Sequence, residues 1–513
     1  MEYIINTITK LSHRFIHDSF HVACATLVSR IFGLARDISV AHFFGATGIL
    51  DAFFIAFKVP NLLRRLFAEG AFAQSWVPML QQSREPVVLF QSLWTFIGLF
   101  SLVVLAMGEY AAPFWVHCLA PGFALYSQQM TLAVDLFRIL LPFLFFVLST
   151  ALFSAAANAR FAFTWPALTP LLLNLTTLVT LWVWIASFDF SLKALAWGIV
   201  LGGLIQMLSF WPLLHRQGWV LGIHLNKQMS VWIAALFKTL PGIVSVSIAQ
   251  LVLMTDLILA SYLPAGSISA LVYADRLVAM PVSLIGVAIS TVLLPHLAKL
   301  SSSGAQITAQ NSIRQSLHLI FLFGLPATIG LVLFAGPLTV TLFQTGVFTA
   351  ADSLRLEQCL ILWAIGLPAI LLIKIVASIA HAKQAFRWPC YLSGMALILN
   401  IVLGSAAMKE WGIQGLLTVS DLLLWMNAAG LLLTERACLH SMWSQSFFRY
   451  LSQVILALVP FSTVLFLFSF YWQTVRLNGY VERWIFVLVT VIFSIGIYGL
   501  SLYGLGVRKK NLL

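Results

Sequence analysis

The chain has 513 residues, of which 61% are hydrophobic and only 9% are charged, whereas about 25% of the residues of a typical globular domain carry a charge. This composition excludes a string of soluble domains and indicates a membrane protein. The formal net charge is +12, but the basic residues are dispersed among apolar segments, which excludes a nucleic-acid-binding patch. The sequence contains no GxxxxGK(S/T) phosphate loop, which excludes ATP hydrolysis by a P-loop domain.

Apolar windows of about 20 residues, the length that a helix needs to cross a bilayer, recur along the whole chain. They predict an all-α integral membrane protein with about fourteen transmembrane helices. In chain order the predicted spans lie near residues 20–44, 51–80, 87–114, 128–157, 163–187, 194–213, 231–263, 269–298, 315–343, 354–381, 388–407, 412–434, 450–471 and 484–507.

The basic residues between the spans predict the orientation of the chain in the membrane. With the N-terminus in the cytoplasm, fifteen Lys and Arg residues fall on the inner side and four on the outer side, namely Lys193, Lys409, Arg476 and Arg483. Because short cytoplasmic loops are enriched in Lys and Arg, this distribution predicts that both termini are cytoplasmic.

A short repeat predicts how the helices are grouped. Ala162–Pro166 (AFTWP) recurs as Ala385–Pro389 (AFRWP), an offset of 223 residues, and similar offsets relate Pro142 to Pro368 and Asp37 to Asp256. We expect two six-helix lobes of the same orientation, in which the substrate site lies near the midplane. The predicted boundaries are 1–215 for the N-terminal lobe, 216–440 for the C-terminal lobe, and 441–513 for an extra pair of helices that offers a groove for a lipid tail.

Charged residues within the first two spans and the eighth span predict the substrate site. Each ion at the centre of a membrane helix costs about 2.5 to 3.5 kcal/mol on insertion scales, so such residues must face water or partners. Some neutralise each other, as Arg36 and its neighbour Asp37 can, but cations outnumber acids. A cationic surplus predicts an anionic ligand, and arginine suits phosphate. The charged residues that we expect at this site are Arg30, Arg36, Asp51, Lys58, Arg64, Glu69 and Arg276.

Asp256 lies alone among the apolar residues of the seventh predicted span. An acid at that depth serves either as a cation or proton site or as the partner of a buried arginine, so Asp256 is the candidate for ion coupling. The five cysteines form no CxxC pair, so we expect neither a structural metal site nor any other cofactor.

One long motif resembles a known family. The segments Ser29–Asp37 (SRIFGLARD), Asp51–Phe54 (DAFF) and Phe57–Phe72 (FKVPNLLRRLFAEGAF) are similar to the conserved region of the MurJ (MviN) lipid II flippases, as are Tyr273–Leu277 (YADRL) and Leu293–Pro295 (LLP). The resemblance implies that Arg30, Arg36, Asp51, Arg64 and Arg276 line the transport cavity. It gives Lys58, Asn61 and Glu69 supporting places.

The resemblance also implies the function. A member of this family, in the multidrug/oligosaccharidyl-lipid/polysaccharide exporter superfamily, is a transporter and not an enzyme. It would move lipid II, the undecaprenyl-pyrophosphate-linked precursor of peptidoglycan in the bacterial cell wall, across the inner membrane. Alternating access through the cationic cavity would carry the headgroup outward, and the protein would act as a monomer whose partners are lipid II and membrane lipids.

One departure from the family and three alternatives qualify this expectation. Some relatives bind sodium with an acid near the position of Ala385, so sodium coupling is not expected here. A flippase for another prenyl-linked glycan would share most of these features. A drug/cation antiporter of the same superfamily would need acids rather than an arginine surplus, and a membrane glycosyltransferase would need clustered catalytic acids.

Overall fold

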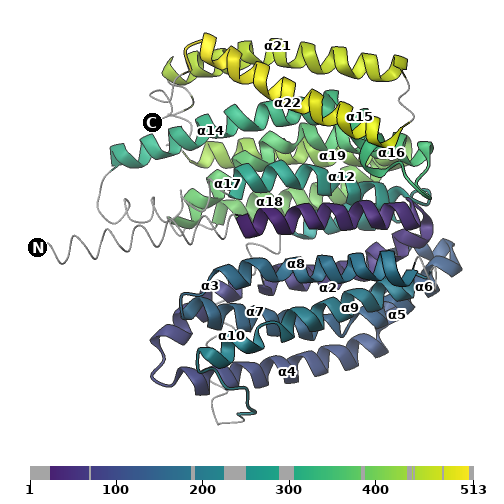
Figure 1. Ribbon diagram of the computed structural model, residues 1–513, viewed down its shortest axis with the longest axis vertical. Coiled ribbons are helices and arrows are strands. Elements are labelled where there is room, and N and C mark those ends of the chain that lie inside the picture. The colour runs from purple at the N-terminus through teal and green to yellow at the C-terminus, as the bar shows by residue number, and fades with distance from the viewer. Residues whose placement is uncertain are drawn as a thin grey trace, which may run out of the picture. The chain divides into compact units, whose positions relative to one another are not determined.

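The computed structural model describes residues 24–68, 71–185, 191–224, 250–287, 306–382, 387–435, 442, 445–475 and 479–507. The described residues are helical with short turns, and no strand occurs among them. They divide into two compact units (Figure 1). Unit 1 contains Met1–Phe44 and Gly48–Gln250, and unit 2 contains Gly45–Thr47 and Leu251–Leu513.

Unit 1 packs around one buried helix. The helix over residues 24–44 is followed by α2 (Gly48–Ala68), α3 (Ala71–Gln82), α4 (Pro86–Tyr110), α5 (Ala112–Leu119), η1 (Pro121–Leu125), α6 (Ser127–Leu140), α7 (Phe143–Ala159), α8 (Thr164–Val179), η2 (Thr180–Ile185), α9 (Leu192–Leu208) and α10 (Trp211–Arg216). Helix α7 is apolar on every side, which is typical of a central helix, and it contacts α2, α3, α4 and α9. Its run Ala155–Ala157 is fully buried.

After Gly45–Thr47, the described part of unit 2 resumes at Leu251, within the short apolar helix Gln250–Ala260. It continues with α12 (Ser267–Pro281), η3 (Val282–Val287), α14 (Gln306–Leu333), α15 (Ala335–Phe343), α16 (Ala350–Ile365), α17 (Leu367–Ala382), α18 (Arg387–Leu399), η4 (Asn400–Gly404), α19 (Ser405–Thr434), α21 (Gln445–Val475) and α22 (Tyr480–Gly504). The last two helices lie side by side and pack on α14 and α15 (Figure 1). Their contact is built from aromatic and aliphatic side chains such as Tyr450, Phe461 and Tyr498.

The hydropathy of these helices fits a membrane protein. Within the described ranges, nine helices are long and apolar enough to cross a membrane, or ten if the bent pair Ala350–Ile365 and Leu367–Ala380 is one span. The first, second and seventh predicted spans correspond to helices that carry charges or are only partly described. An all-helical membrane protein is therefore the observed class, and the count of fourteen helices stays a prediction.

Several spans are interrupted, and these breaks position the polar residues considered below. Of the π-helical turns, η2 and η4 each follow directly on the helix that begins at the repeated AFTWP or AFRWP segment. Helices α16 and α17 meet at Gly366 with a bend of 41°. Within α19, Gly412 has a positive φ of 60°, a conformation that glycine adopts without strain. The sequence predicted an unbroken span over 354–381, and the bend at Gly366 is a difference from that prediction.

The boundary between the two units, at residues 250/251, lies downstream of the predicted lobe boundary at 215/216. The segment 225–249 between the two positions lies outside the described residues. The predicted C-terminal pair over 441–513 corresponds to α21 and α22, which belong to unit 2. The three predicted domains therefore stay a prediction.

Candidate functional site

A polar cluster in unit 1 forms around Arg36. Its Nε and one terminal nitrogen donate to Oδ1 of Asp37 at 3.1 and 2.7 Å, and the other terminal nitrogen donates to Oδ1 of Asn174 at 3.0 Å. The Asn174 amide nitrogen in turn donates to the backbone carbonyl of Ser29 at 3.1 Å. The Arg36 and Asp37 side chains are only 17% and 11% exposed. Arg36 is thus neutralised locally and fixed by an amide on α8.

The same helix is held a second time, one turn further along. Trp182, in the π-helical turn η2, donates from its indole nitrogen to the Ser39 hydroxyl at 2.9 Å. Its ring stacks on His42 at 5.4 Å and meets Phe43 edge-on. Because a π turn adds a residue to the helical repeat, η2 rotates the side chains that follow Asn174. Two side chains from α8 and η2 therefore fix the helix over residues 24–44.

Helix α2 carries the next group of predicted site residues. It runs without a break from Gly48 to Ala68 although Pro60 lies inside it, so Asp51 and Lys58 share a face, as residues seven apart do on a continuous helix. Asp51 is 3% exposed, whereas Lys58, Asn61 and Arg64 are half-buried.

One pair of the predicted residues on α2 is joined by a direct hydrogen bond. Arg64 donates from Nε to Oδ1 of Asn61 at 3.2 Å, which orients its guanidinium. Glu69 lies outside the described residues, as does the side chain of Arg65. Arg30, on the preceding helix, and Arg276, on α12 of unit 2, are both half-buried. The gathering of the whole set around one ligand stays a prediction.

Unit 2 contains a second buried polar cluster, centred on Asp256. This carboxylate is 2% exposed and accepts hydrogen bonds on Oδ1 from the Asn400 amide at 2.8 Å and from the Ser420 hydroxyl at 2.7 Å. Asn400 begins the π-helical turn η4, and Ser420 lies on α19. No three His, Cys, Asp or Glu side chains of the described ranges are close enough together to hold a metal ion.

The two clusters share a plan. Asp37 and Asp256 are related by the predicted repeat, and each lies near an asparagine from the helix that ends in a π-helical turn. The asparagines, Asn174 and Asn400, are 226 residues apart, which is within the range of the other repeat offsets. Unit 1 differs because Arg36 stands between the acid and the amide.

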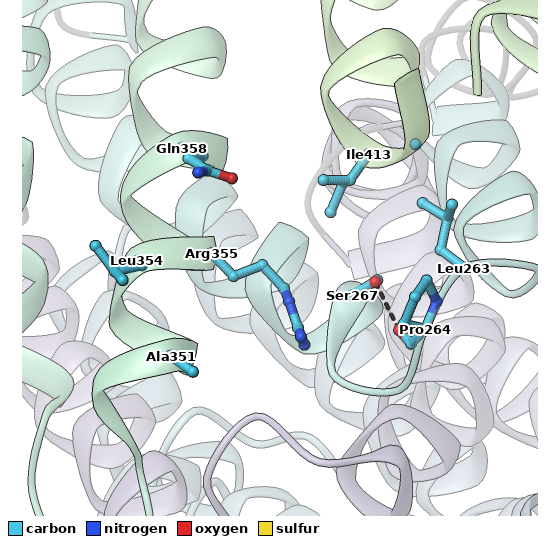
Figure 2. A pocket seen from close by; sticks show the side chains of 9 residues that line it. Leu263, Pro264, Ser267, Ala351, Leu354, Arg355, Gln358 and Ile413 are labelled. Carbon is cyan, nitrogen blue, oxygen red and sulfur yellow. Dashed lines mark hydrogen bonds between the residues drawn. The ribbon is translucent and has the colours of Figure 1, made fainter. Parts of the chain in front are cut away.

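A separate pocket of about 390 Å³ opens in unit 2 near the beginning of α12. Arg355 reaches across it from α16 toward Ser267 and Pro264, and Ile413 and Leu263 form the opposite wall (Figure 2). One terminal nitrogen of Arg355 donates to the Ala265 carbonyl at 2.7 Å. The guanidinium is thus fixed by the backbone of the preceding loop in a pocket with mostly apolar walls.

Some functional candidates were not found by reasoning from the sequence. Asn174, Ser420 and Asp421 were not selected, because neutral amides and hydroxyls give no charge signal and because Asp421 lies in an otherwise apolar span. The predicted repeat could have identified Asn174, because Asn174 is the residue of the first half that corresponds to Asn400 in the second. Elsewhere in unit 1, Arg138 forms a salt bridge of 3.3 Å with Glu109.

Comparison with known proteins identifies the family. The family model described as "Lipid II flippase MurJ" matches residues 40–500. The lipid II flippase MurJ of Burkholderia cenocepacia is 36% identical over 385 residues, which cover 73% of this chain and 75% of that protein. A solved structure of lipid II flippase MurJ in an inward closed conformation is similar with a TM-score of 0.78 and 22% identity, covering 95% of this chain and 99% of that one.

The fold also resembles that of more distant transporters. An inward-facing multidrug resistance MATE family transporter of the MOP superfamily matches with a TM-score of 0.67 and 11% identity, over 81% of this chain and 96% of that one. At this identity the likeness concerns the fold alone. The family model, which spans most of the chain, and the curated relative, which is more than 30% identical, agree with each other. The chain therefore belongs to the MurJ family of lipid II flippases.

Proposed function

We propose that this protein moves lipid II from the cytoplasmic to the periplasmic leaflet of a bacterial inner membrane, as a step in peptidoglycan biosynthesis. Membership of the MurJ family over residues 40–500 is the observation that carries this proposal. The protein is a transporter, so its task is to lower the barrier that the charged headgroup meets in hydrocarbon. No chemical step on the substrate is required.

The headgroup of lipid II is anionic because of its pyrophosphate, and the proposed site supplies the opposite charge. Arg30, Arg36 and Arg64 project from two helices of unit 1 that each carry further polar residues. Only three of the five N–H groups of Arg36 are used in the bonds to Asp37 and Asn174. The residues proposed to contact the substrate are Arg30, Arg36, Asp51, Lys58, Asn61, Arg64, Glu69 and Arg276.

Alternating access is the proposed mechanism, with fourteen helices arranged as lobes 1–215 and 216–440 and an extra pair in 441–513. The repeated features support it: α6 and α7 are interrupted at Pro142, α16 and α17 before Pro368, and a π-helical turn follows the next helix in both halves. Rigid lobes built from repeats are typical of transporters that alternate their access. Both termini are proposed to be cytoplasmic.

The prenyl tail needs an apolar surface along the route. Helices α21 and α22 expose large side chains such as Phe466, Phe470 and Ile492, which suits lipid or the tail of the substrate. The membrane potential favours outward movement of net negative charge by about 2.3 kcal/mol per charge per 100 mV. We propose that the protein works as a monomer that uses this potential.

The first prediction tests the cationic site. Arg30, Arg36, Arg64 and Arg276 are changed singly to Ala in cells depleted of their own lipid II flippase. Each variant is expected to abolish growth, because the pyrophosphate loses a positively charged donor. Membrane abundance is measured by immunoblot, and Arg216→Ala, which removes an exposed cation on α10, serves as the matched control. Normal growth with three of the four variants would contradict the site.

Two other substrates remain as outcomes of a second measurement. Native mass spectrometry of the protein purified from membranes identifies the lipid that accompanies it. Lipid II is the expected species. A different prenyl-linked glycan would mean that the protein transports that lipid by the same mechanism. A bound cationic drug and no lipid would support the antiporter alternative, although the surplus of arginine argues against it.

A further inference from the structure

Asp421 is an acid in the middle of α19 that the proposed mechanism does not use. Its residue surface is only 8% exposed. Among the residues that the structure describes, it takes part in no hydrogen bond and no ion pair. Burial of an ionised carboxylate without a partner is so unfavourable that such a group normally binds a proton instead.

The carboxyl of Asp421 lies on a helix break. A Cβ added to Gly366, where α16 meets α17 at an angle of 41°, would lie 2.5 Å from Oδ1 of Asp421. One turn along α19, Trp425 donates from its indole nitrogen to the Ile365 carbonyl at 3.2 Å. Two side chains of α19 therefore contact the bend, and the lack of a side chain on Gly366 lets the carboxyl approach its backbone.

A second carboxyl stands next to this position. Ser420, the residue directly before Asp421, donates its hydroxyl to Asp256. Asp256 has a second donor in Asn400, so its ionised form is stabilised by hydrogen bonds, whereas Asp421 has no such donor in the described part of unit 2. Of two neighbouring carboxyls in a low-dielectric interior, one is expected to remain protonated. The hydrogen bonds assign the charge to Asp256 and the proton to Asp421.

The charged groups on the neighbouring elements do not alter this assignment. On α16, Glu357 packs against Gly336 of α15, and on α17, Lys374 packs against Gly286 of η3. On α19, Lys409 and Glu410 precede the break at Gly412 and are exposed, and on α18 Arg387 is exposed at the first residue. None of these described side chains is recorded in contact with Asp421.

We propose that Asp421 is a proton-binding site of unit 2, held neutral against the α16–α17 break while Asp256 remains ionised, and that its proton exchanges with water during the transport cycle. This inference rests on the proposed transport function for its role in the cycle. The step is a simple protonation: the carboxyl takes H⁺ from water on one side and returns it to water in the other state, with no other group oxidised or reduced.

The consequence for the bend follows from the charge. A neutral carboxyl can lie against the backbone of Gly366, and a carboxylate cannot do so without water or a cation. Loss of the proton is therefore expected to draw Asp421 away from the break and to change the bend between α16 and α17. Unit 1 has no counterpart, because α9 carries no acid.

The test measures the proton directly and measures transport separately. Purified full-length protein is reconstituted in lipid, and infrared difference spectra are recorded between mildly acidic and alkaline buffers. The wild type is expected to show the carbonyl stretch of one buried neutral carboxylic acid, and Asp421→Asn, a neutral mimic of similar shape, is expected to lack it. Asp421→Glu retains a carboxyl and should retain a band with a shifted midpoint.

Two controls locate the proton. Glu410→Gln removes an exposed acid from the same helix and should leave the band unchanged. Asp256→Asn removes the neighbouring negative charge, so the band should persist with its midpoint moved to lower pH. A band that survives in Asp421→Asn, or that disappears in Asp256→Asn, overturns the assignment. In the same liposomes, flipping of labelled lipid II by Asp421→Asn is expected to lose the pH dependence shown by the wild type, and an unchanged dependence also overturns the proposal. Absence of flipping by the wild type would instead contradict the proposed function and leave the infrared test of Asp421 intact.

Discussion

At the residue scale, the two polar clusters show how charged side chains are accommodated inside this apolar protein, since each is paired with hydrogen-bonding partners. The sequence predicted the pairing of Arg36 with Asp37 because the two are neighbours. It could not predict that Asn174, 138 residues away, would complete the arrangement, because a single amide in an apolar helix gives no periodic or charge signal. Such a contact is decided by the packing of α8 on the helix over 24–44.

A prediction at the residue scale concerns the hydrogen bonds of Asn174. Asn174→Ala removes an acceptor from Arg36 and a donor from the Ser29 carbonyl, and leaving such buried groups unsatisfied costs about 1 to 3 kcal/mol. We expect a lower apparent melting temperature of the detergent-purified protein and weaker support of growth in the depletion strain. Both are measured at one heating rate and one expression level, since membrane proteins often unfold irreversibly.

The matched control is Asn158→Ala on α7. The Asn158 side-chain oxygen is buried but has no hydrogen-bond partner among the described residues, so its removal breaks no bond of this kind. If Asn158→Ala lowered the melting temperature as much as Asn174→Ala, the hydrogen bonds of Asn174 would not be the cause.

At the element scale, hydropathy predicted the helices better than their interruptions. The spans near 87–114 and 194–213 correspond closely to α4 and to α9 with α10. The bend at Gly366 was missed because Gly366 and Pro368 lie within a strongly apolar run, and glycine and proline are common in membrane helices, where neighbouring helices satisfy the freed backbone groups. The π-helical turns were missed for a similar reason, since a single added residue does not change the mean hydropathy.

Close packing between elements leads to another prediction. A Cβ on Gly198 of α9 would collide with Oγ1 of Thr180 and lie 2.7 Å from its Cγ2. Thr180 cannot turn away freely, because its hydroxyl donates to the Thr176 carbonyl and β-branched side chains have few rotamers. Gly198→Ala should therefore destabilise the protein by about 1 to 3 kcal/mol, as overpacking does.

Gly98→Ala is the control for this substitution. Gly98 lies inside α4 with no atom within 4 Å of an added Cβ, so the change should be neutral or raise stability by about 0.5 to 1 kcal/mol through the lower chain entropy of alanine. Thermal unfolding of the two variants side by side measures the difference. Equal melting temperatures would show that α9 does not pack tightly on η2.

At the scale of the whole molecule, composition and hydropathy predicted the all-helical membrane class, and the long motif over 29–72 predicted the family. The orientation in the membrane depends on the count of basic residues in the loops, because the helices alone would satisfy either direction. The direction of transport that we propose depends on this orientation. Its test needs positions where a cysteine can be introduced without strain.

The loop glycines are poor positions for such a test. Gly266 and Gly346, both in predicted outer loops, have φ angles of +87° and +59°, which other residues adopt at a cost. A Cβ on Gly266 would also collide with the Ala46 carbonyl oxygen. Leu125 and Trp411, which are 73% and 69% exposed in predicted outer segments, and Ile223, which is 81% exposed in a predicted inner loop, avoid this strain.

The last prediction uses these three positions. In a chain whose five cysteines are replaced by serine or alanine, Leu125→Cys and Trp411→Cys should react with a membrane-impermeant thiol reagent added outside intact spheroplasts. Ile223→Cys should react only after the membrane is permeabilised. The reason is electrostatic: the predicted inner side holds fifteen basic residues against four on the predicted outer side, and short loops rich in Lys and Arg are retained in the cytoplasm. Each variant must still support growth in the depletion strain, so that the labelled protein is the functional one. The reverse pattern, with only Ile223→Cys accessible from outside, would invert the topology. An inverted topology would contradict the outward direction of lipid II transport that we propose.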